Sequence, residues 1–267
     1  MFYNAANSQL KINDAAMDYI RFGTGKKNLI FIPGLGDGLR TVKGTALPFA
    51  FMYRAFAKDY TVWVFSRKSP LEQHCTTRTM AADISNAMDM LNIEKAHIIG
   101  VSQGGMIAQW LAIDFSQKVD KLILAVTLSR QNDTVQQVIN SWIDMARADD
   151  FRTLTIDNFE KSYTESYLKK YRLFYPLIVP FMKPADKTRF ILQAGSCLTH
   201  DCHQYLHRIT GPTLIICGEK DRIVTASPSY DMAREIKGSR LVSFPAYGHA
   251  VYEEAKDFNT VMLDFLK

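Results

Sequence analysis

The chain has 267 residues, of which 47% are hydrophobic and 22% charged, and its formal net charge is +5. A chain this apolar can bury enough surface to fold, which excludes intrinsic disorder. It contains no block of five or six like charges, so we expect no nucleic-acid partner. The longest apolar stretch, residues 173–182, is too short for a membrane span, so no stable membrane insertion is expected.

The N-terminus and the cysteines indicate a cellular compartment. The first ten residues have neither a basic start nor an apolar core, so no secretory signal is predicted. The four cysteines are too few for a disulfide scaffold and form no Cys-x-x-Cys pair; they are Cys75, Cys197, Cys202 and Cys217. We therefore expect reduced thiols and a cytoplasmic protein. Nothing in the composition indicates an oligomeric state.

Apolar runs alternate with helical patterns from about Leu29 onward. Short runs rich in aliphatic, β-branched and aromatic residues predict strands at 29–32, 60–65, 96–99 and 122–128. Apolar residues at helical spacing predict helices at 80–91 and 106–115. This alternation is typical of parallel strands joined by right-handed crossovers, so the fold class is α/β, with helices on both faces of a mostly parallel sheet.

The alternation is interrupted by a long helical segment. Residues 131–200 show helical patterning with many aromatic residues, after which strands are predicted at 213–217 and 241–244 and helices at 229–236 and 252–267. We therefore predict one sheet domain, formed by residues 1–130 and 201–267, with a helical insertion at 131–200.

A serine lies between a predicted strand and a predicted helix. Residues 100–104 read Gly-Val-Ser-Gln-Gly, which fits the pattern Gly-x-Ser-x-Gly. A serine in a sharp strand-to-helix turn needs small residues two positions away, and such a turn lifts the hydroxyl above the sheet. We therefore expect Ser102 to be a nucleophile.

A serine hydroxyl needs an oriented base. His249 follows the predicted strand at 241–244, and Asp221 follows the strand at 213–217 by a short loop. These two residues are the candidate base and its orienting carboxylate. Glu219 is the rival for the carboxylate, although it sits nearer the strand end.

Three other histidines form an alternative constellation. His200, His203 and His207 are spaced three and four residues apart, and Cys202 lies among them. On one helix face such a group could bind a metal ion, but this spacing is more typical of a partly solvated helix surface. We expect no metal site.

The order Ser102, Asp221, His249 and the motifs around these residues resemble the α/β-hydrolase superfamily, in the branch with a helical cap inserted after the sixth core strand. The resemblance covers nearly the whole chain and implies a Ser-His-Asp triad. It also implies an oxyanion hole formed by the backbone N–H groups of Leu35, in the segment Pro33-Gly34-Leu35-Gly36, and of Gln103. Pro33 stands where the family usually has histidine.

The resemblance implies hydrolysis through an acyl-enzyme without a cofactor or metal. The expected reaction is cleavage of a carboxylic ester, or a similar acyl bond, of a small and partly apolar substrate. A lactonase, a C–C bond hydrolase, an aminopeptidase or a weakly catalytic ligand-binding homologue remain alternatives on the same scaffold. An aminopeptidase would need cap carboxylates for the substrate amine, and Glu160 and Glu165 are the candidates.

The cap composition bears on the substrate. Its aromatic stretch at 171–181 is expected to supply an apolar wall to the substrate pocket. Residues 151–190 contain eight Lys or Arg and four Asp or Glu, so their net charge is +4. This charge indicates a solvated face or, as the alternative, a face that attracts anionic substrates or a membrane surface.

Overall fold

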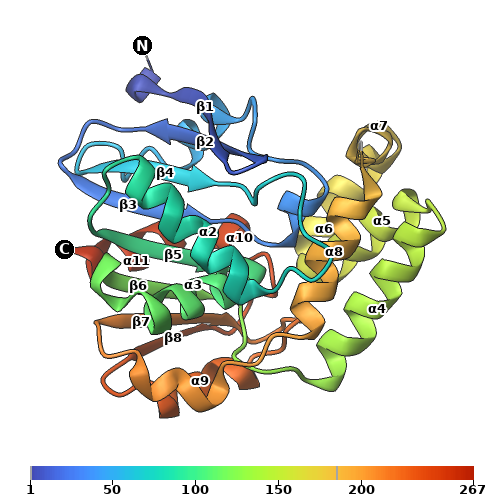
Figure 1. Cartoon of the computed structure of the whole chain (residues 1–267). Coiled ribbons are helices and arrows are strands. Elements are labelled where there is room, and N and C mark those ends of the chain that lie inside the picture. The colour runs from blue at the N-terminus through green and yellow to red at the C-terminus, as the bar shows by residue number, and fades with distance from the viewer. Residues whose placement is uncertain (1, 185) are drawn as a thin grey trace.

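An eight-stranded sheet organises the chain (Figure 1). The computed structural model describes residues 2–184 and 186–267. The strand order is β1-β2-β4-β3-β5-β6-β7-β8, and the six strands from β3 to β8 pair in parallel. These six are β3 (Lys27–Ile32), β4 (Tyr60–Phe65), β5 (Ala96–Val101), β6 (Val119–Ala125), β7 (Thr213–Gly218) and β8 (Arg240–Phe244). The predicted mostly parallel sheet is confirmed.

Two N-terminal strands were not predicted. β1 (Ala6–Ile12) and β2 (Ala15–Phe22) form an antiparallel hairpin, and β2 also pairs antiparallel with β4. β1 is an edge strand whose residues are mostly exposed, so it lacks the apolar run of the buried strands. The connecting turn contains Asn13 at φ 55°, a left-handed conformation that asparagine tolerates well.

Helices cover both faces of the sheet because the buried strands send alternate side chains to opposite sides. Ile30 and Ile32 pack in a core with α2 (Thr77–Met90), α3 (Gln103–Asp114) and α9 (Ser227–Glu235). The neighbouring Leu29 and Phe31 pack in a second core with α1 (Ala46–Met52), α10 (Val251–Glu254) and α11 (Phe258–Leu266).

The segment between β6 and β7 is helical, and Figure 1 shows its helices gathered on one side of the sheet. Its elements are α4 (Asp133–Arg147), α5 (Phe151–Ser162), α6 (Glu165–Tyr171), η4 (Arg172–Phe174), α7 (Tyr175–Ile178), η5 (Val179–Met182) and α8 (Lys187–Leu198). A third core joins α4, α5 and α8 to Leu35 and Met106 of the sheet domain. The segment is therefore packed onto the rest of the molecule.

Several predicted boundaries were wrong by a few residues, and two of the differences have a clear physical cause. The strand predicted at 122–128 spans 119–125 instead, because Val126 adopts a left-handed φ of 46° that ends the strand. The single helix predicted at 252–267 is divided into α10 and α11, because the chain leaves helical geometry at Ala255, the C-cap of α10.

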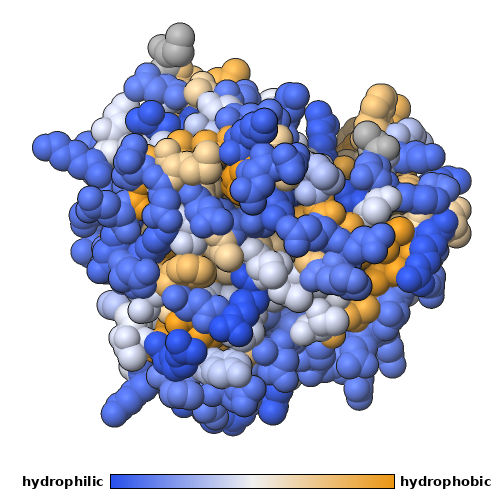
Figure 2. Space-filling model, in the orientation of Figure 1, coloured by the Kyte–Doolittle hydropathy of each residue, from blue (hydrophilic) through white to orange (hydrophobic). Residues whose placement is uncertain are grey.

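Figure 2 shows a surface that is largely hydrophilic in the same orientation, with apolar residues reaching it over the helical segment. Among residues 2–184 and 186–267, no helix combines the length and the apolar character that crossing a membrane requires.

His200 is a buried residue where the end of the helical segment packs against the sheet domain. Its Nδ1 lies 2.8 Å from Thr77 Oγ1 and its Nε2 lies 3.5 Å from Cys202 Sγ. Burial lowers the pKa of His200 to about 3, so the imidazole is neutral in the folded protein.

This burial predicts a loss of stability in acid. An unfolded histidine has a pKa of about 6.5, so below that pH the unfolded chain binds a proton at His200. The folded chain binds this proton only near pH 3 and below. Between pH 6.5 and 5.5, the free energy of unfolding should fall by about 1 kcal/mol more in the wild type than in His200→Gln. Urea denaturation at both pH values measures this difference. His74→Gln, at an exposed histidine outside this contact, is the control for the substitution itself.

Candidate active site

Ser102 stands at the junction of β5 and α3. It is the N-cap of α3, with φ 54° and ψ −120°, a left-handed φ that is uncommon for a residue with a side chain. The turn is held by hydrogen bonds: the Ser102 N–H donates to Ala125 O at 2.9 Å, and Thr127 Oγ1 donates to Ser102 O at 2.8 Å. Strain at one residue is thus offset by bonds to the strand β6 and its following loop.

The glycines around Ser102 are required by close packing. A Cβ added at Gly104 would lie 1.9 Å from Ile32 O, and one at Gly100 would lie 2.5 Å from Gly104 O. Since real Cβ atoms do not approach backbone oxygens this closely, a side chain at either position would displace the turn from the sheet. The predicted reason for the Gly-x-Ser-x-Gly spacing therefore agrees with this geometry.

Asp221 and His249 lie together although 28 residues separate them. His249 Nδ1 is 2.8 Å from Asp221 Oδ2, and both side chains are buried. The other carboxylate oxygen, Oδ1, accepts the N–H groups of Ile223 and Val224 at 2.8 and 2.9 Å. Burial alone would raise the pKa of Asp221, but His249 and these two N–H groups more than offset it and the pKa is lowered. The carboxylate is therefore ionised and fixed in orientation.

Glu219 takes no part in this arrangement. It is exposed, and its Oε1 accepts the Tyr230 hydroxyl at 2.6 Å on the surface. Of the two candidate carboxylates, it is Asp221 that the fold brings to His249.

Leu35 and Gln103 each begin a helical element beside Ser102. Leu35 opens the short helix η2 (Leu35–Gly38), and a Cβ added to the preceding Gly34 would lie 3.3 Å from Ser102 Cβ, so this loop passes close to the serine. Within the part of the chain that the structure describes, the N–H groups of Leu35 and Gln103 donate no hydrogen bond. Both are therefore free to bind an acceptor.

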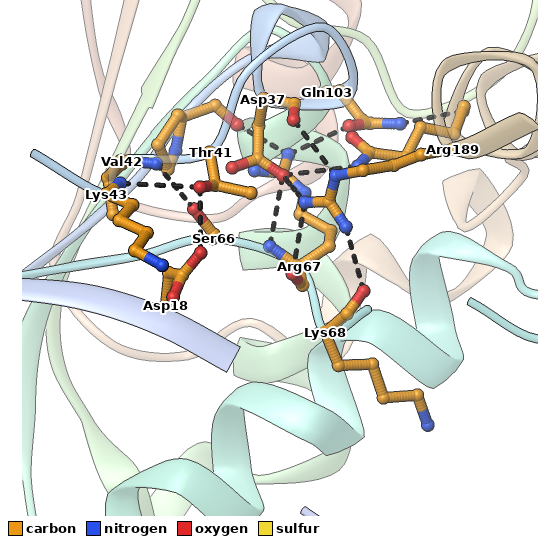
Figure 3. Close-up of polar contacts among 12 residues, drawn as sticks. Asp18, Asp37, Thr41, Val42, Lys43, Ser66, Arg67, Lys68, Gln103 and Arg189 are labelled. Atoms are coloured by element: carbon orange, nitrogen blue, oxygen red, sulfur yellow. Dashed lines mark hydrogen bonds and ion pairs between the residues drawn. The ribbon is translucent and has the colours of Figure 1, made fainter. Parts of the chain in front are cut away.

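A buried polar network holds the loop that contains Leu35 (Figure 3). The Asp37 side chain has no solvent exposure, and its Oδ2 accepts from Arg189 Nη2 at 2.5 Å, Arg67 N at 3.1 Å and Gln193 Nε2 at 3.2 Å. Arg189 also donates to Asp37 O and to the carbonyl oxygens of Arg67 and Lys68. Because Arg189 and Gln193 belong to α8, the helical segment supports the loop directly.

Arg67 connects that loop with the turn containing Ser102. Its Nη2 donates to Pro33 O at 2.5 Å and to Gln103 Oε1 at 2.9 Å, while Gln103 Nε2 donates to Gln193 O at 2.7 Å. Sequence reasoning missed this network. One signal was present, because Arg67 is a charged residue only two positions after the entirely buried strand β4.

Ser102 and His249 line one cavity of about 940 Å³. Its walls come from the loop after β3, from α1 and from the helical segment, including Val135, Ile139, Trp142, Leu154, Phe181 and Met182. The expected apolar wall at 171–181 was wrong for most of that stretch. Within the described residues, only Phe181 of that stretch lines this cavity, and Phe174 is 49% exposed.

The histidine constellation does not share one helix face. His200 precedes the 3₁₀-helix η6 (His203–Arg208) and is buried, His203 Nδ1 lies 2.9 Å from Ser129 Oγ, and His207 is exposed. Among residues 2–184 and 186–267, no group of three or more His, Cys, Asp or Glu side chains is placed to hold a metal ion.

Comparison with known proteins identifies the family. The family model described as alpha/beta hydrolase fold matches residues 27–256. The chain belongs to this family. The placement of the helical segment after the sixth strand of this alpha/beta hydrolase agrees with the predicted branch.

Several relatives and solved structures are similar to this alpha/beta hydrolase. A 2-hydroxy-6-oxononadienedioate/2-hydroxy-6-oxononatrienedioate hydrolase from a Pseudomonas species is 27% identical over 210 residues, covering 76% of this chain and 74% of the relative. The enol-lactonase from Burkholderia xenovorans LB400 superposes with a TM-score of 0.83 at 21% identity, covering 97% and 99% of the two chains. An esterase from Exiguobacterium antarcticum has a TM-score of 0.79 at 21% identity, with 98% and 99% covered.

The Asp37 network predicts a difference between two arginine variants. Arg189→Met leaves a buried carboxylate without its main cation, which should lower the free energy of unfolding by about 3–5 kcal/mol. Arg172→Met removes an exposed, solvent-screened ion pair with Glu160 and Glu165 and should lower the free energy of unfolding far less. Urea denaturation of both variants measures the difference. Equal losses would contradict the role assigned to burial.

Proposed function

We propose that this alpha/beta hydrolase is a serine hydrolase that cleaves a carboxylic ester, or a similar acyl bond, of a small and partly apolar substrate. The proposed triad is Ser102, His249 and Asp221. The observation that carries the proposal is the buried Asp221–His249 hydrogen bond, with His249 lining the same cavity as the strained Ser102. The names of two structural neighbours, an esterase and an enol-lactonase, agree with hydrolysis of acyclic or cyclic esters.

The proposed chemistry follows from the proton positions. Asp221 is ionised and accepts the Nδ1 proton of His249, which leaves Nε2 as the basic nitrogen. His249 takes the hydroxyl proton as Ser102 attacks the carbonyl carbon, and then passes it to the leaving group. Water activated by the same imidazole hydrolyses the acyl-enzyme.

The N–H groups of Leu35 and Gln103 are the proposed oxyanion donors. Neither is engaged by another described residue, and Gln103 lies at the N-terminus of α3, where the helix dipole favours negative charge. Losing one such donor typically costs about 3–4 kcal/mol of transition-state stabilisation. Arg67 donates to Pro33 O in the Leu35 loop and to the side chain of Gln103, so it can brace the loop in which Pro33 stands where the family usually has histidine.

The cavity supports a small and mostly apolar substrate. Its lining residues are mainly aliphatic and aromatic, with a few charged groups that include Arg40 and Lys183. An aminopeptidase is less well supported, because Glu160 and Glu165 are both bound by Arg172 and neither lines the cavity within the described chain. Lactone and C–C bond hydrolysis use the same nucleophile and remain the alternative reactions.

Ser102→Ala should abolish turnover. Loss of a serine nucleophile costs about 10⁶-fold in kcat, whereas the thermal midpoint should change little because the serine side chain makes no hydrogen bond to another described residue. The assay uses p-nitrophenyl acetate and butyrate, an enol-lactone, a 2-hydroxy-6-oxo-dienoate and an aminoacyl amide. Wild-type turnover of the esters above the other substrates supports the proposal. Residual ester turnover near the wild-type rate in the variant would remove Ser102 from it.

Asp221→Asn and Glu219→Gln separate the two candidate carboxylates. The first change should lower kcat by about 10⁴-fold, because an amide in place of the carboxylate no longer fixes the imidazole tautomer. The second removes only a surface contact with Tyr230 and should alter kcat less than twofold. The measurement is ester turnover at pH 7.5. If Glu219→Gln caused the larger loss, the proposed acid would be wrong.

A further inference from the structure

The end of the helical segment exposes an unusual number of large apolar side chains. We define the apolar ridge as Tyr171, Leu173, Phe174, Leu177, Ile178 and Phe181, which belong to α6, η4, α7 and η5. Leu173 is 83% exposed, Leu177 67% and Phe181 81%. Figure 1 shows α7 at the outer end of the helical segment, and in Figure 2 the same corner carries apolar colours. Since single exposed apolar residues are common but clusters are not, the ridge marks a contact surface.

The charge around the ridge identifies the chemistry of its partner. No Asp or Glu occurs from residue 166 to residue 184, whereas Lys169, Lys170, Arg172 and Lys183 lie in that interval. Arg172 is neutralised by Glu160 and Glu165. The three lysines are exposed and flank the ridge on both sides in the sequence. A surface with apolar side chains between lysines matches the interface of an anionic lipid layer.

The ridge also lies beside the cavity. Phe181, together with the adjacent Met182 and Lys183, lines the cavity that contains Ser102. A molecule dissolved in a lipid layer could therefore pass from the layer to the cavity along Phe181. A second copy of this chain fits less well, because a twofold contact would place two lysine-flanked ridges against each other.

We propose that the apolar ridge docks this protein peripherally on the surface of an anionic lipid bilayer, with the cavity opening beside the docked face. Leu173, Phe174, Leu177 and Phe181 enter the boundary between headgroups and acyl chains, and Lys169, Lys170 and Lys183 lie against anionic headgroups. The docking does not depend on the proposed chemistry, so Ser102→Ala should bind membranes as the wild type does.

Vesicle sedimentation tests the proposal. The full chain is mixed with phosphatidylcholine vesicles that contain either no or 30% phosphatidylglycerol, a composition chosen for the assay, and the bound fraction gives a partition coefficient. We expect binding to the anionic vesicles that weakens as salt is raised, because charges outside the membrane are screened. Binding to neither vesicle, or equally to both, would overturn the proposal.

Two double variants separate the apolar and the basic contributions. Leu173→Ser/Leu177→Ser should lower the partition coefficient at least about tenfold through lost apolar burial. Lys169→Gln/Lys170→Gln should lower it about 30-fold. Leu173 and Leu177 do not line the cavity. Turnover of a soluble acetyl ester by the leucine double variant should therefore stay unchanged and report correct folding.

Matched controls come from exposed residues outside the helical segment. Met90→Ser/Tyr230→Ser removes side chains that are 48% and 40% exposed on α2 and α9, and Lys237→Gln/Lys256→Gln removes two exposed charges. Both controls should bind like the wild type, and a loss equal to that of the ridge variants would overturn the proposal. A concentration-dependent dimer in size-exclusion chromatography, dissolved by Leu173→Ser/Leu177→Ser without vesicle binding, would identify a second copy as the partner instead.

Discussion

A carboxylate without solvent contact constrains the whole candidate site. Burying the charge of Asp37 is costly unless cations and N–H donors surround it. The fold meets this requirement by bringing Arg189 and Gln193 from α8, and the backbone of Arg67 from the end of β4, to a single oxygen atom. Since these donors come from α8 and from the end of β4, far from Asp37 in the sequence, satisfying one charge fixes how three segments sit around Ser102.

A second set of contacts fixes the loop of His249. The Ala250 N–H donates to Ser162 O at 2.9 Å, at the end of α5. Thr164 donates through its N–H and its hydroxyl to Glu254, and the Tyr163 hydroxyl donates to Glu253. The helical segment is thus bonded to both sides of the cavity, near Leu35 through α8 and near His249 through the α5–α6 connection. It contributes to the geometry of the site as well as to its walls.

The sequence predicted the features that depend on local patterns and missed those that depend on contacts between residues far apart in the chain. The turn at Ser102 and the parallel strands were predictable because glycine spacing and buried apolar runs are local signals. The proximity of Asp221 and His249 was predictable because each lies in the loop that follows a strand at the same sheet edge. The Asp37 network pairs residues up to 156 positions apart, so a local pattern such as the charged Arg67 after a buried strand cannot reveal which residues it pairs. The edge strand β1 was missed because its exposed face needs no apolar run.

The two anchor points of the helical segment divide it into parts with different freedom to change during evolution. Residues near Ser162 and along α8 are hydrogen-bonded to the loops of His249 and Leu35, so substitutions there change the geometry of the candidate site as well as the shape of the segment. Within the described residues, the stretch from η4 to η5 between them makes no hydrogen bond to either loop, so its side chains can change without displacing the loops of Leu35 and His249. Replacing this part of the insertion with a foreign helical segment would therefore require transplanting only its interior, with Arg189 and Gln193 of this chain retained because they hold the Leu35 loop.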